Sequence, residues 1–284
     1  MSTIAESLAS ATRELSRCSD SPHLDAELLL GKVLARTRSG LIVDGERRLD
    51  DACERAYAGL LAERLAGAPV AYLTGTREFW SLPLAVTSAV LVPRPETETL
   101  VELVLDHLPP GCDCAVLDLG TGSGAIAIAI ASERPKARVT GTDLSMCALQ
   151  VAMGNSKNLG LSEIAWRQGS WFDAVPGERF DVIVANPPYI AASDAALAAL
   201  RAEPLLALTP GATGLEAFES IVAAAGDHLT DEGVLALEHG SEQAQQVAAL
   251  LERHEFKDIR SHADRSGRLR VTLASIHSQR KVPT

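Results

Sequence analysis

The spacing of apolar positions divides the chain into a helical first part and a later part in which strands and helices alternate. Over residues 1–75, apolar residues recur every three or four positions, as in residues 24–34, which follow Ser21 and Pro22. Serine and proline suit the N-cap and first turn of a helix, and apolar residues at this spacing lie on one helical face. Residues 50–65 repeat the pattern. We predict a small helical domain over residues 1–75.

A short β-rich stretch follows the helical part. Residues 79–82 and 84–86 are rich in aromatic and aliphatic side chains and are separated by Pro83. Two short strands around a breaker are typical of a hairpin. We predict a β-hairpin linker over residues 76–94.

Residues 95–284 alternate between apolar strands and amphipathic helices, beginning with a helix opened by Pro93, Arg94 and Pro95. The predicted strands are residues 115–118, 138–143, 165–168, 181–185, 234–238 and 268–274. Helices are predicted at residues 125–133, 145–158 and 214–228, and also at the Ala-rich residues 191–202. Continuously apolar strands that alternate with helices indicate a mostly parallel sheet buried on both faces, the α/β class.

Charge narrows the range of partners. The chain is 46% hydrophobic and 22% charged, which is typical of globular proteins, and its net charge is −11. Residues 1–75 carry 9 basic and 11 acidic side chains, so neither part of the chain is a basic module. A protein that coats a phosphate backbone needs clustered cations. The composition therefore disfavours direct binding to nucleic acid.

Five cysteines form no repeated CxxC pair and have no clustered histidines beside them. They are Cys18, Cys53, Cys112, Cys114 and Cys147. We expect reduced thiols and no metal site. The start of the chain has no basic segment followed by an apolar one, and no run of 18 apolar residues occurs. We therefore expect a cytoplasmic protein without membrane contact.

A glycine-rich loop lies between a predicted strand and a predicted helix. Its residues are Asp118, Leu119, Gly120, Thr121, Gly122, Ser123 and Gly124. A glycine turn at this place lets the backbone approach a nucleotide-type cofactor and directs amide N–H groups at it. Asp143 ends the next strand, where a carboxylate accepts hydrogen bonds from ribose hydroxyls. Because Gly120, Gly122 and Ala125 also fit a dinucleotide pattern, the loop alone leaves the cofactor open.

Trp171 follows the strand at residues 165–168. Its aromatic face suits packing on an adenine ring, and an ordinary core tryptophan is the alternative. We place Trp171 among the candidate cofactor residues.

The motif Asn186-Pro187-Pro188-Tyr189 directly follows the apolar strand at residues 181–185. The carboxyl ends of parallel strands bind ligands in open α/β sheets, so this motif and the glycine loop are expected at one crevice. The pairing resembles S-adenosylmethionine-dependent methyltransferases that act on planar nitrogen. Such a nitrogen has a delocalised lone pair and needs acceptors that let it pyramidalise. Asn186 offers its side-chain oxygen, Pro187 its carbonyl, and Tyr189 a stacking face.

Nearly the whole chain resembles the HemK-type release-factor glutamine methyltransferases. The resemblance rests on residues 69–75, 78–80, 90–98, 120–127, 186–189 and 237–240. It implies a Rossmann-like methyltransferase domain with a helical, substrate-docking N-terminal domain. It also implies methyl transfer from S-adenosylmethionine, which becomes S-adenosylhomocysteine, to the glutamine side-chain nitrogen of the Gly-Gly-Gln motif in peptide chain release factors. We expect a monomer that needs no metal.

The family's functional residues carry over by position. The resemblance implies that the cofactor is held by Gly120, Thr121, Gly122, Ser123, Gly124, Asp143, Trp171 and Asn186. It implies that the substrate glutamine is bound by Asn186, Pro187, Pro188 and Tyr189, with catalytic roles for Asn186, Pro187 and Tyr189.

Some side chains and functions stay open. Arg94, Glu96 and Glu98 cluster before a helix, where acidic residues also suit the helix dipole, and His239 follows a strand as a candidate structural histidine. An adenine-N6 nucleic-acid methyltransferase would use the same Asn186–Tyr189 motif on a flipped base, but the acidic composition argues against it. A catalytically silent cofactor-binding adaptor and an NAD-dependent oxidoreductase are further alternatives.

Overall fold

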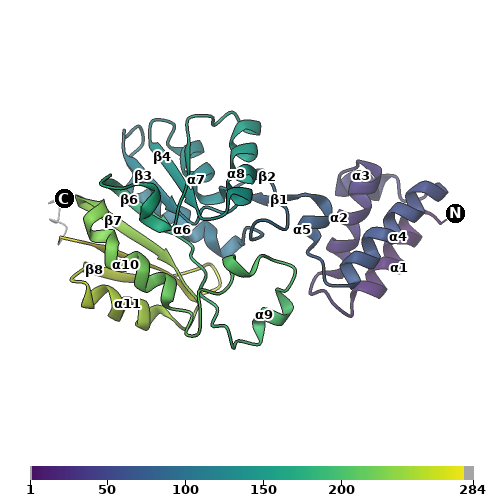
Figure 1. The fold of residues 1–284 in the computed structure, drawn as a ribbon. Helices are drawn as coiled ribbons and strands as arrows, with labels where there is room; N and C mark the ends of the chain where they lie inside the picture. The colour runs from purple at the N-terminus through teal and green to yellow at the C-terminus, as the bar shows by residue number, and fades with distance from the viewer. Residues whose placement is uncertain (1, 278–284) are drawn as a thin grey trace. The chain divides into compact units, whose positions relative to one another are not determined.

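The computed structural model describes residues 2–277 of the chain (Figure 1). The chain divides into two compact units, Met1–Thr76 and Arg77–Thr284. Among the described residues, no helix is long and apolar enough to cross a membrane.

The first unit is helical, as predicted for this stretch. Its helices are α1 (Ile4–Leu15), α2 (Pro22–Leu34), α3 (Arg38–Val43), α4 (Asp51–Leu65) and α5 (Val70–Thr74). Thr3 and Glu6 form a capping box at the start of α1. The apolar faces of these helices meet in one core, into which the Tyr57 ring packs, and the Tyr57 hydroxyl donates to the Ala26 carbonyl at 3.1 Å. The buried Asp25 carboxylate pairs with Arg64 at 2.9 Å.

A two-stranded sheet of β1 (Thr76–Phe79) and β2 (Leu82–Ala85) confirms the predicted hairpin, but its turn lies elsewhere than expected. Trp80 and Ser81, predicted within a strand, are the two turn residues, with φ of 53° and 58°. Positive φ at both central positions is the requirement of a tight type I′ turn. Pro83 lies inside β2, which a strand of so small a sheet tolerates because it is an edge strand.

The second unit is built on a seven-stranded sheet with the order β5-β4-β3-β6-β7-β9-β8 in the described part of the chain. The strands are β3 (Ala115–Leu119), β4 (Arg138–Asp143), β5 (Ala165–Gln168), β6 (Phe180–Ala185), β7 (Leu229–Glu238), β8 (Lys257–Ala263) and β9 (Leu269–Ser275). The five strands β5, β4, β3, β6 and β7 are each parallel to their neighbours within this group. Strand β9 is antiparallel to both of its neighbours, β7 and β8. The predicted α/β class with a mostly parallel sheet is confirmed.

Helices cover both faces of this sheet (Figure 1). They are α6 (Glu98–His107), α7 (Ala125–Glu133), α8 (Met146–Asn158), α10 (Glu216–His228) and α11 (Ala244–Arg253), with the short turns η1 (Pro95–Thr97), η2 (Trp171–Ala174) and η3 (Leu205–Ala207). Val182 and Val184 of β6 join the core that contains α6 and α7. Ile183 and Ala185 join the core that contains α10 and α11. The alternation explains why the strands are apolar at every position.

Two elements differ from the prediction. The Ala-rich residues 191–202 form only one helical turn, α9 (Ala196–Ala199), because this exposed segment has no apolar face to bury against a core. Strand β8 carries charged and polar side chains and was not predicted. It lies at the sheet edge, where polar residues are tolerated since one side has no neighbour.

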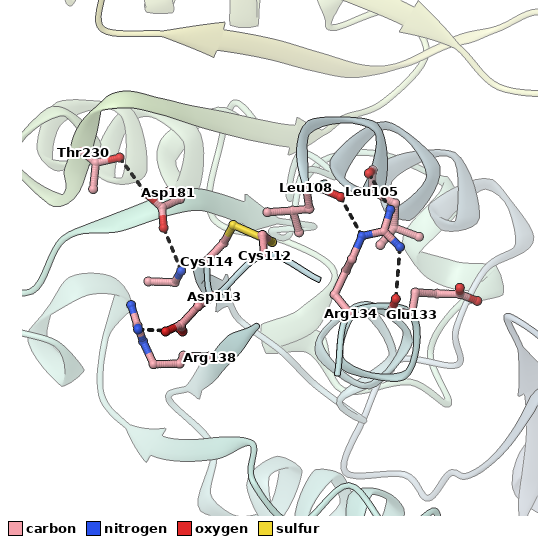
Figure 2. The surroundings of a disulfide bond; sticks show 11 residues. Leu105, Leu108, Cys112, Asp113, Cys114, Glu133, Arg134, Arg138, Asp181 and Thr230 are labelled. Carbon is pink, nitrogen blue, oxygen red and sulfur yellow. Dashed lines mark hydrogen bonds and ion pairs between the residues drawn. A yellow bond between two sulfur atoms is a disulfide. The ribbon is translucent and has the colours of Figure 1, made fainter. Parts of the chain in front are cut away.

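The expected reduced state of all five cysteines is wrong for Cys112 and Cys114, which form a disulfide in the loop before β3 (Figure 2). Their Cα atoms are 5.3 Å apart, within the normal range for a disulfide. A turn in which the Cys112 amide donates to the Pro109 carbonyl at 3.1 Å precedes them, and cysteine counting does not detect such local geometry. Beside the disulfide, Asp113 pairs with Arg138 at 2.8 Å.

Candidate active site

One cavity of about 380 Å³ lies in the second unit and is lined by the glycine loop and by the Asn186 loop. Its size is in the range of small-molecule sites. Most of the predicted site residues line it, namely Gly120, Thr121, Gly122, Ser123, Asp143, Trp171, Asn186 and Pro188. Gly124, Pro187 and Tyr189 lie next to lining residues in the chain but are not part of the wall.

Strand register brings the two motifs together. β3 and β6 are neighbours in the sheet, and Leu119 is the partner of Ala185. Gly120 and Asn186 are the next residues, so both loops leave the sheet at the same level. The direction in which the chain builds the sheet reverses between β3 and β6. After β3, the chain adds β4 and then β5 on one side of it, and it then returns to add β6 and β7 on the other side. Such a reversal point is where open α/β sheets bind ligands.

The glycine loop needs its glycines for backbone conformation. Gly120, Gly122 and Gly124 have φ of 69°, 57° and 81°, a region that side chains with a Cβ rarely adopt. A Cβ on Gly124 would lie 3.0 Å from Ile128 and Trp166, so this position also allows close packing. The loop at Gly122 is open, with no heavy atom within 4 Å of an added Cβ. A ligand can therefore approach the backbone here.

Asp143 closes the glycine loop from the neighbouring strand. One carboxylate oxygen accepts the Gly122 amide at 2.9 Å, and the other accepts the Ser145 amide at 2.8 Å. Burial raises the pKa of Asp143. A carboxylate offers about four lone-pair positions, so each oxygen keeps acceptor capacity for a ligand hydroxyl at the cavity wall. Asp143 is thus both a brace for the loop and a candidate ribose ligand.

Asp118 lies beneath the loop and is completely buried. One of its oxygens accepts the Thr121 hydroxyl at 2.5 Å and the Ala127 amide at 3.2 Å. Its other oxygen is buried without a hydrogen-bond partner among the described residues. Desolvation raises the pKa of Asp118 to about 7, against the effect of those two hydrogen bonds. Asp118 thus links the glycine loop to the first turn of α7.

Trp171 forms part of the cavity wall and starts η2 with φ of 47°. Its ring lies near Gly120, since a Cβ on that glycine would be 3.5 Å from the Trp171 Cζ3 atom. A non-glycine residue at positive φ costs free energy and is found where the surrounding structure or a site requires it. The half-buried indole is thus held against the glycine loop, as a ring that packs on an adenine would be.

The residues of the Asn186 loop differ in whether they face the cavity or are buried. Asn186 and Pro188 line the cavity, whereas Pro187 is buried. The Asn186 Nδ2 donates to the Thr97 hydroxyl at 3.2 Å. Burial raises the pKa of the Tyr189 phenol to about 12, and the Tyr189 carbonyl accepts from Gln243 at 3.0 Å. The structure thus brings Asn186 to the cavity wall, while Gln243 holds the backbone carbonyl of Tyr189.

Two supporting residues escaped the sequence interpretation. Asn155 on α8 bridges hairpin and loop: its side-chain oxygen accepts the Ala85 amide at 2.7 Å, and its nitrogen donates to the Ser123 carbonyl at 2.9 Å. A polar residue at a core-spaced position of α8 was the available signal. Glu203 is 3% exposed in its side chain and lies in a segment without periodicity, so no pattern pointed to it.

The remaining candidates have structural partners. Arg94 pairs with Glu203, and Glu98 accepts the Trp80 amide at 3.0 Å. Glu96 is exposed in the middle of the η1 turn. His239 is fully buried, with its ring nitrogens at 2.9 Å from the Gly240 carbonyl and the Thr272 hydroxyl. Among the residues that the structure describes, no group of acidic, histidine or cysteine side chains is arranged to hold a metal ion.

Comparison with known proteins places this geometry in a family. The model "PrmC N-terminal domain" matches residues 6–75, and the model "Methyltransferase small domain" matches residues 96–211. A methyltransferase structure from Pyrococcus furiosus shares the fold, with a TM-score of 0.54 and 19% identity, covering 69% of this chain and 90% of that one. The Rossmann-like methyltransferase fold expected from the sequence is therefore confirmed.

Relatives of known function match nearly the whole chain. The release factor glutamine methyltransferase of Aliivibrio fischeri is 44% identical over 258 residues, which is 90% of either chain. The protein of the same name from Coxiella burnetii is 40% identical and covers 96% of this chain and 99% of its own. The chain therefore belongs to the release factor glutamine methyltransferase family.

Proposed function

We propose that this enzyme transfers a methyl group from S-adenosylmethionine to the side-chain amide nitrogen of the glutamine in the Gly-Gly-Gln motif of peptide chain release factors. The observation that carries the proposal is the meeting of the Gly120 loop and the Asn186 loop at one cavity, at the ends of the paired strands β3 and β6. The relatives' names support the substrate. Because that substrate acts in translation, we place the reaction in the cytoplasm.

The cavity residues fit the cofactor. The turn consists of Gly120, Thr121, Gly122, Ser123 and Gly124. Asp143 supplies an acceptor for the ribose hydroxyls, Trp171 supplies a face for the adenine, and Asn186 lines the same cavity. The open backbone at Gly122 and the spare acceptor capacity of Asp143 support this assignment. When bound, S-adenosylmethionine supplies an electrophilic methyl group on a positively charged sulfur.

The chain's own residues orient the nucleophile. Held by the glycine loop, Asp143 and Trp171, S-adenosylmethionine would supply its methyl group to the amide nitrogen and would keep the electron pair of the carbon–sulfur bond. The nitrogen becomes strongly acidic as it attacks, so its proton leaves to water. Asn186 Oδ1, at the cavity wall, accepts one amide hydrogen, and Pro188 stiffens the loop. We assign the second acceptor to the Pro187 carbonyl and the support of the flat amide to Tyr189, although neither residue lines the cavity in this structure. Such positioning is worth up to about 7–11 kcal/mol in the most favourable cases.

The test compares substrates with the same enzyme and cofactor. Purified release factor, adenine-containing duplex DNA and buffer alone are incubated with the enzyme and methyl-labelled S-adenosylmethionine. We expect label on the release factor only. Label on the duplex alone would overturn the proposal in favour of an adenine-N6 methyltransferase. Calorimetric titration with S-adenosylmethionine and with NAD separates the oxidoreductase alternative, since we expect heat only from the former.

We further propose that residues 1–75 dock the protein substrate, that residues 76–94 link the parts, and that residues 95–284 carry out methyl transfer. A short Gly-Gly-Gln peptide then measures binding at the cavity alone, whereas the whole release factor also measures docking on residues 1–75. Removal of residues 1–75 should raise KM for the whole factor and leave KM for the peptide unchanged. Equal KM values for the whole factor with and without residues 1–75 would contradict the docking role.

A further inference from the structure

We propose that Thr97 and Glu238 are positioning residues that hold the Asn186 carboxamide in one orientation, with its nitrogen turned toward them and its oxygen left for the substrate amide. This inference rests on the proposed function, because it concerns the end of Asn186 that meets the glutamine. Neither Thr97 nor Glu238 has a role in the mechanism described so far.

Strand register places Glu238 beside Asn186. β6 and β7 pair in parallel, and Ala185 is the partner of Leu237. Asn186 and Glu238 follow these partners and so leave adjacent strands at the same level. Glu238 is only 1% exposed, while Asn186 lines the cavity. A buried carboxyl therefore lies directly behind the residue proposed to bind the substrate.

The hydrogen bonds between these residues have a fixed direction. The Asn186 Nδ2 donates to the Thr97 hydroxyl oxygen at 3.2 Å. Thr97 is 4% exposed, and the contact of its hydroxyl with the Glu238 carboxylate lowers the pKa of that carboxyl, as a hydroxyl that directs its one hydrogen at the carboxylate does. A weaker contact with the Asn186 side chain also lowers the Glu238 pKa. Above about pH 7, where the Glu238 carboxyl is ionised, it only accepts, so the chain of donors runs from Asn186 through Thr97 to Glu238.

This direction decides which end of the carboxamide faces the cavity. The oxygen and nitrogen of an asparagine side chain are nearly equal in size, so packing alone does not distinguish them. Turning the amide by half a rotation would set Oδ1 against the carboxylate and the lone pairs of Thr97. Two acceptors would then meet without a hydrogen between them. The observed arrangement avoids that contact and leaves Oδ1 as the free acceptor.

Burying the Glu238 carboxyl at this position costs free energy of folding. Its Oε2 is buried without a hydrogen-bond partner among the described residues, and burial opposes its ionisation. A buried polar atom without a partner destabilises the folded protein. Thr97, Asn186 and the Arg270 charge each lower the Glu238 pKa and so offset part of the cost of burying this carboxyl.

The first experiment measures kcat and KM for release factor with Thr97→Val, Thr97→Ser and Glu238→Gln. Valine removes the acceptor for Asn186, and a glutamine at 238 adds an N–H that stabilises the turned amide. Loss of a residue that orients a metal ligand typically costs 10- to 100-fold, and by analogy we expect roughly that fall in kcat for T97V and E238Q. The dissociation constant for S-adenosylmethionine should change less than kcat, because both substitutions leave the glycine loop and Asp143 in place.

Two comparisons separate orientation from general damage. T97S restores the hydroxyl and should recover most of the wild-type kcat. Thr99→Val changes a buried threonine two residues away and should leave kcat unchanged. A T97V enzyme with wild-type kcat, or a T97S enzyme as impaired as T97V, would overturn the inference.

A second measurement does not depend on methyl transfer. Melting temperatures of T97V, Asn186→Ala and the double variant test whether the two side chains interact. We expect the double variant to lose less than the sum of the single losses. Additive losses would refute the inference even if the wild-type enzyme methylates release factor. A different outcome would separate this inference from the proposed function. If the wild type does not methylate release factor but the losses in melting temperature are non-additive, the proposed substrate is wrong and the Thr97–Asn186 interaction stands.

Discussion

The Glu203 carboxylate accepts the Val92 backbone amide at 3.0 Å, across 111 residues of sequence. Its other oxygen pairs with Arg94. These contacts tie the segment after the Asn186 loop to the segment that leads into α6. Leu91, Arg94, Pro204 and Leu206 all line the cavity, so the Glu203 contacts hold two parts of its wall together.

Glu203→Ala should destabilise the protein by about 3 kcal/mol, because it leaves a buried amide and the Arg94 guanidinium without their acceptor. Urea unfolding gives the free energy. The exposed Glu252 on α11 offers a control, and Glu252→Ala should change the free energy of unfolding by less than about 0.5 kcal/mol. Equal stabilities of the E203A and E252A variants would contradict the bracing role.

Asp143→Asn should weaken binding of S-adenosylmethionine by about 10- to 100-fold, the scale of a hydrogen bond to a charged group. The amide that replaces the carboxylate turns a donor toward either the ribose or the Gly122 amide. Isothermal titration calorimetry measures the change. Asp106→Asn, at an exposed position on α6, should bind the cofactor as the wild type does. Wild-type affinity of D143N would remove Asp143 from the cofactor site.

Asn186→Ala should lower kcat by about 100-fold or more while leaving part of the cofactor affinity, because it removes an acceptor aimed at the reacting nitrogen. Steady-state kinetics with release factor and a binding titration separate the two effects. Asn158→Ala, at the exposed end of α8, is the matched control with unchanged kcat. An N186A enzyme that turns over like the wild type would exclude the assigned role.

The free energy of unfolding should fall as pH rises through neutrality, partly because of Glu238. Desolvation raises the pKa of this carboxyl from 4.5 to about 7 in the folded protein, with Arg270 acting against and Glu96 adding to the rise. Between these values the folded protein keeps a proton that the unfolded chain has released. The stabilisation is therefore complete below about pH 4.5 and is lost as pH passes about 7.

Glu238→Gln removes this titration, so its unfolding free energy should depend less steeply on pH between about 5 and about 8. Each unit of difference in pKa corresponds to about 1.4 kcal/mol. Urea unfolding of both proteins across this range measures the two slopes. Parallel curves would show that Glu238 does not titrate with a raised pKa in the folded protein.

Local patterns predicted the parts of the fold that depend on local chemistry. The apolar strand before the glycine loop and the helix after it are visible in sequence because burial on both faces demands apolar residues throughout. The turn at Trp80 and Ser81 was misplaced because neither residue is typical of positive φ. The polar edge strand β8 was missed because its stability comes from pairing with β9.

The site could be predicted as two motifs but not as a network. Gly120 and Asn186 carry recognisable sequence signals, and parallel strands bring their loops to one edge. Glu203 and Glu238 act through partners far away in the chain, and no spacing rule connects Glu203 with Val92. Residues 237–240 do carry part of the family resemblance, but the neighbours of Glu203 and Glu238 follow only from the folded structure.

Tandem mass spectrometry of the release factor after reaction tests the central claim most directly. The account predicts a mass increase of one methyl group on the side-chain amide of the Gly-Gly-Gln glutamine, present with the wild-type enzyme and strongly reduced with N186A. The account would be contradicted by a release factor that stays unmodified at this glutamine although the enzyme is folded and binds S-adenosylmethionine.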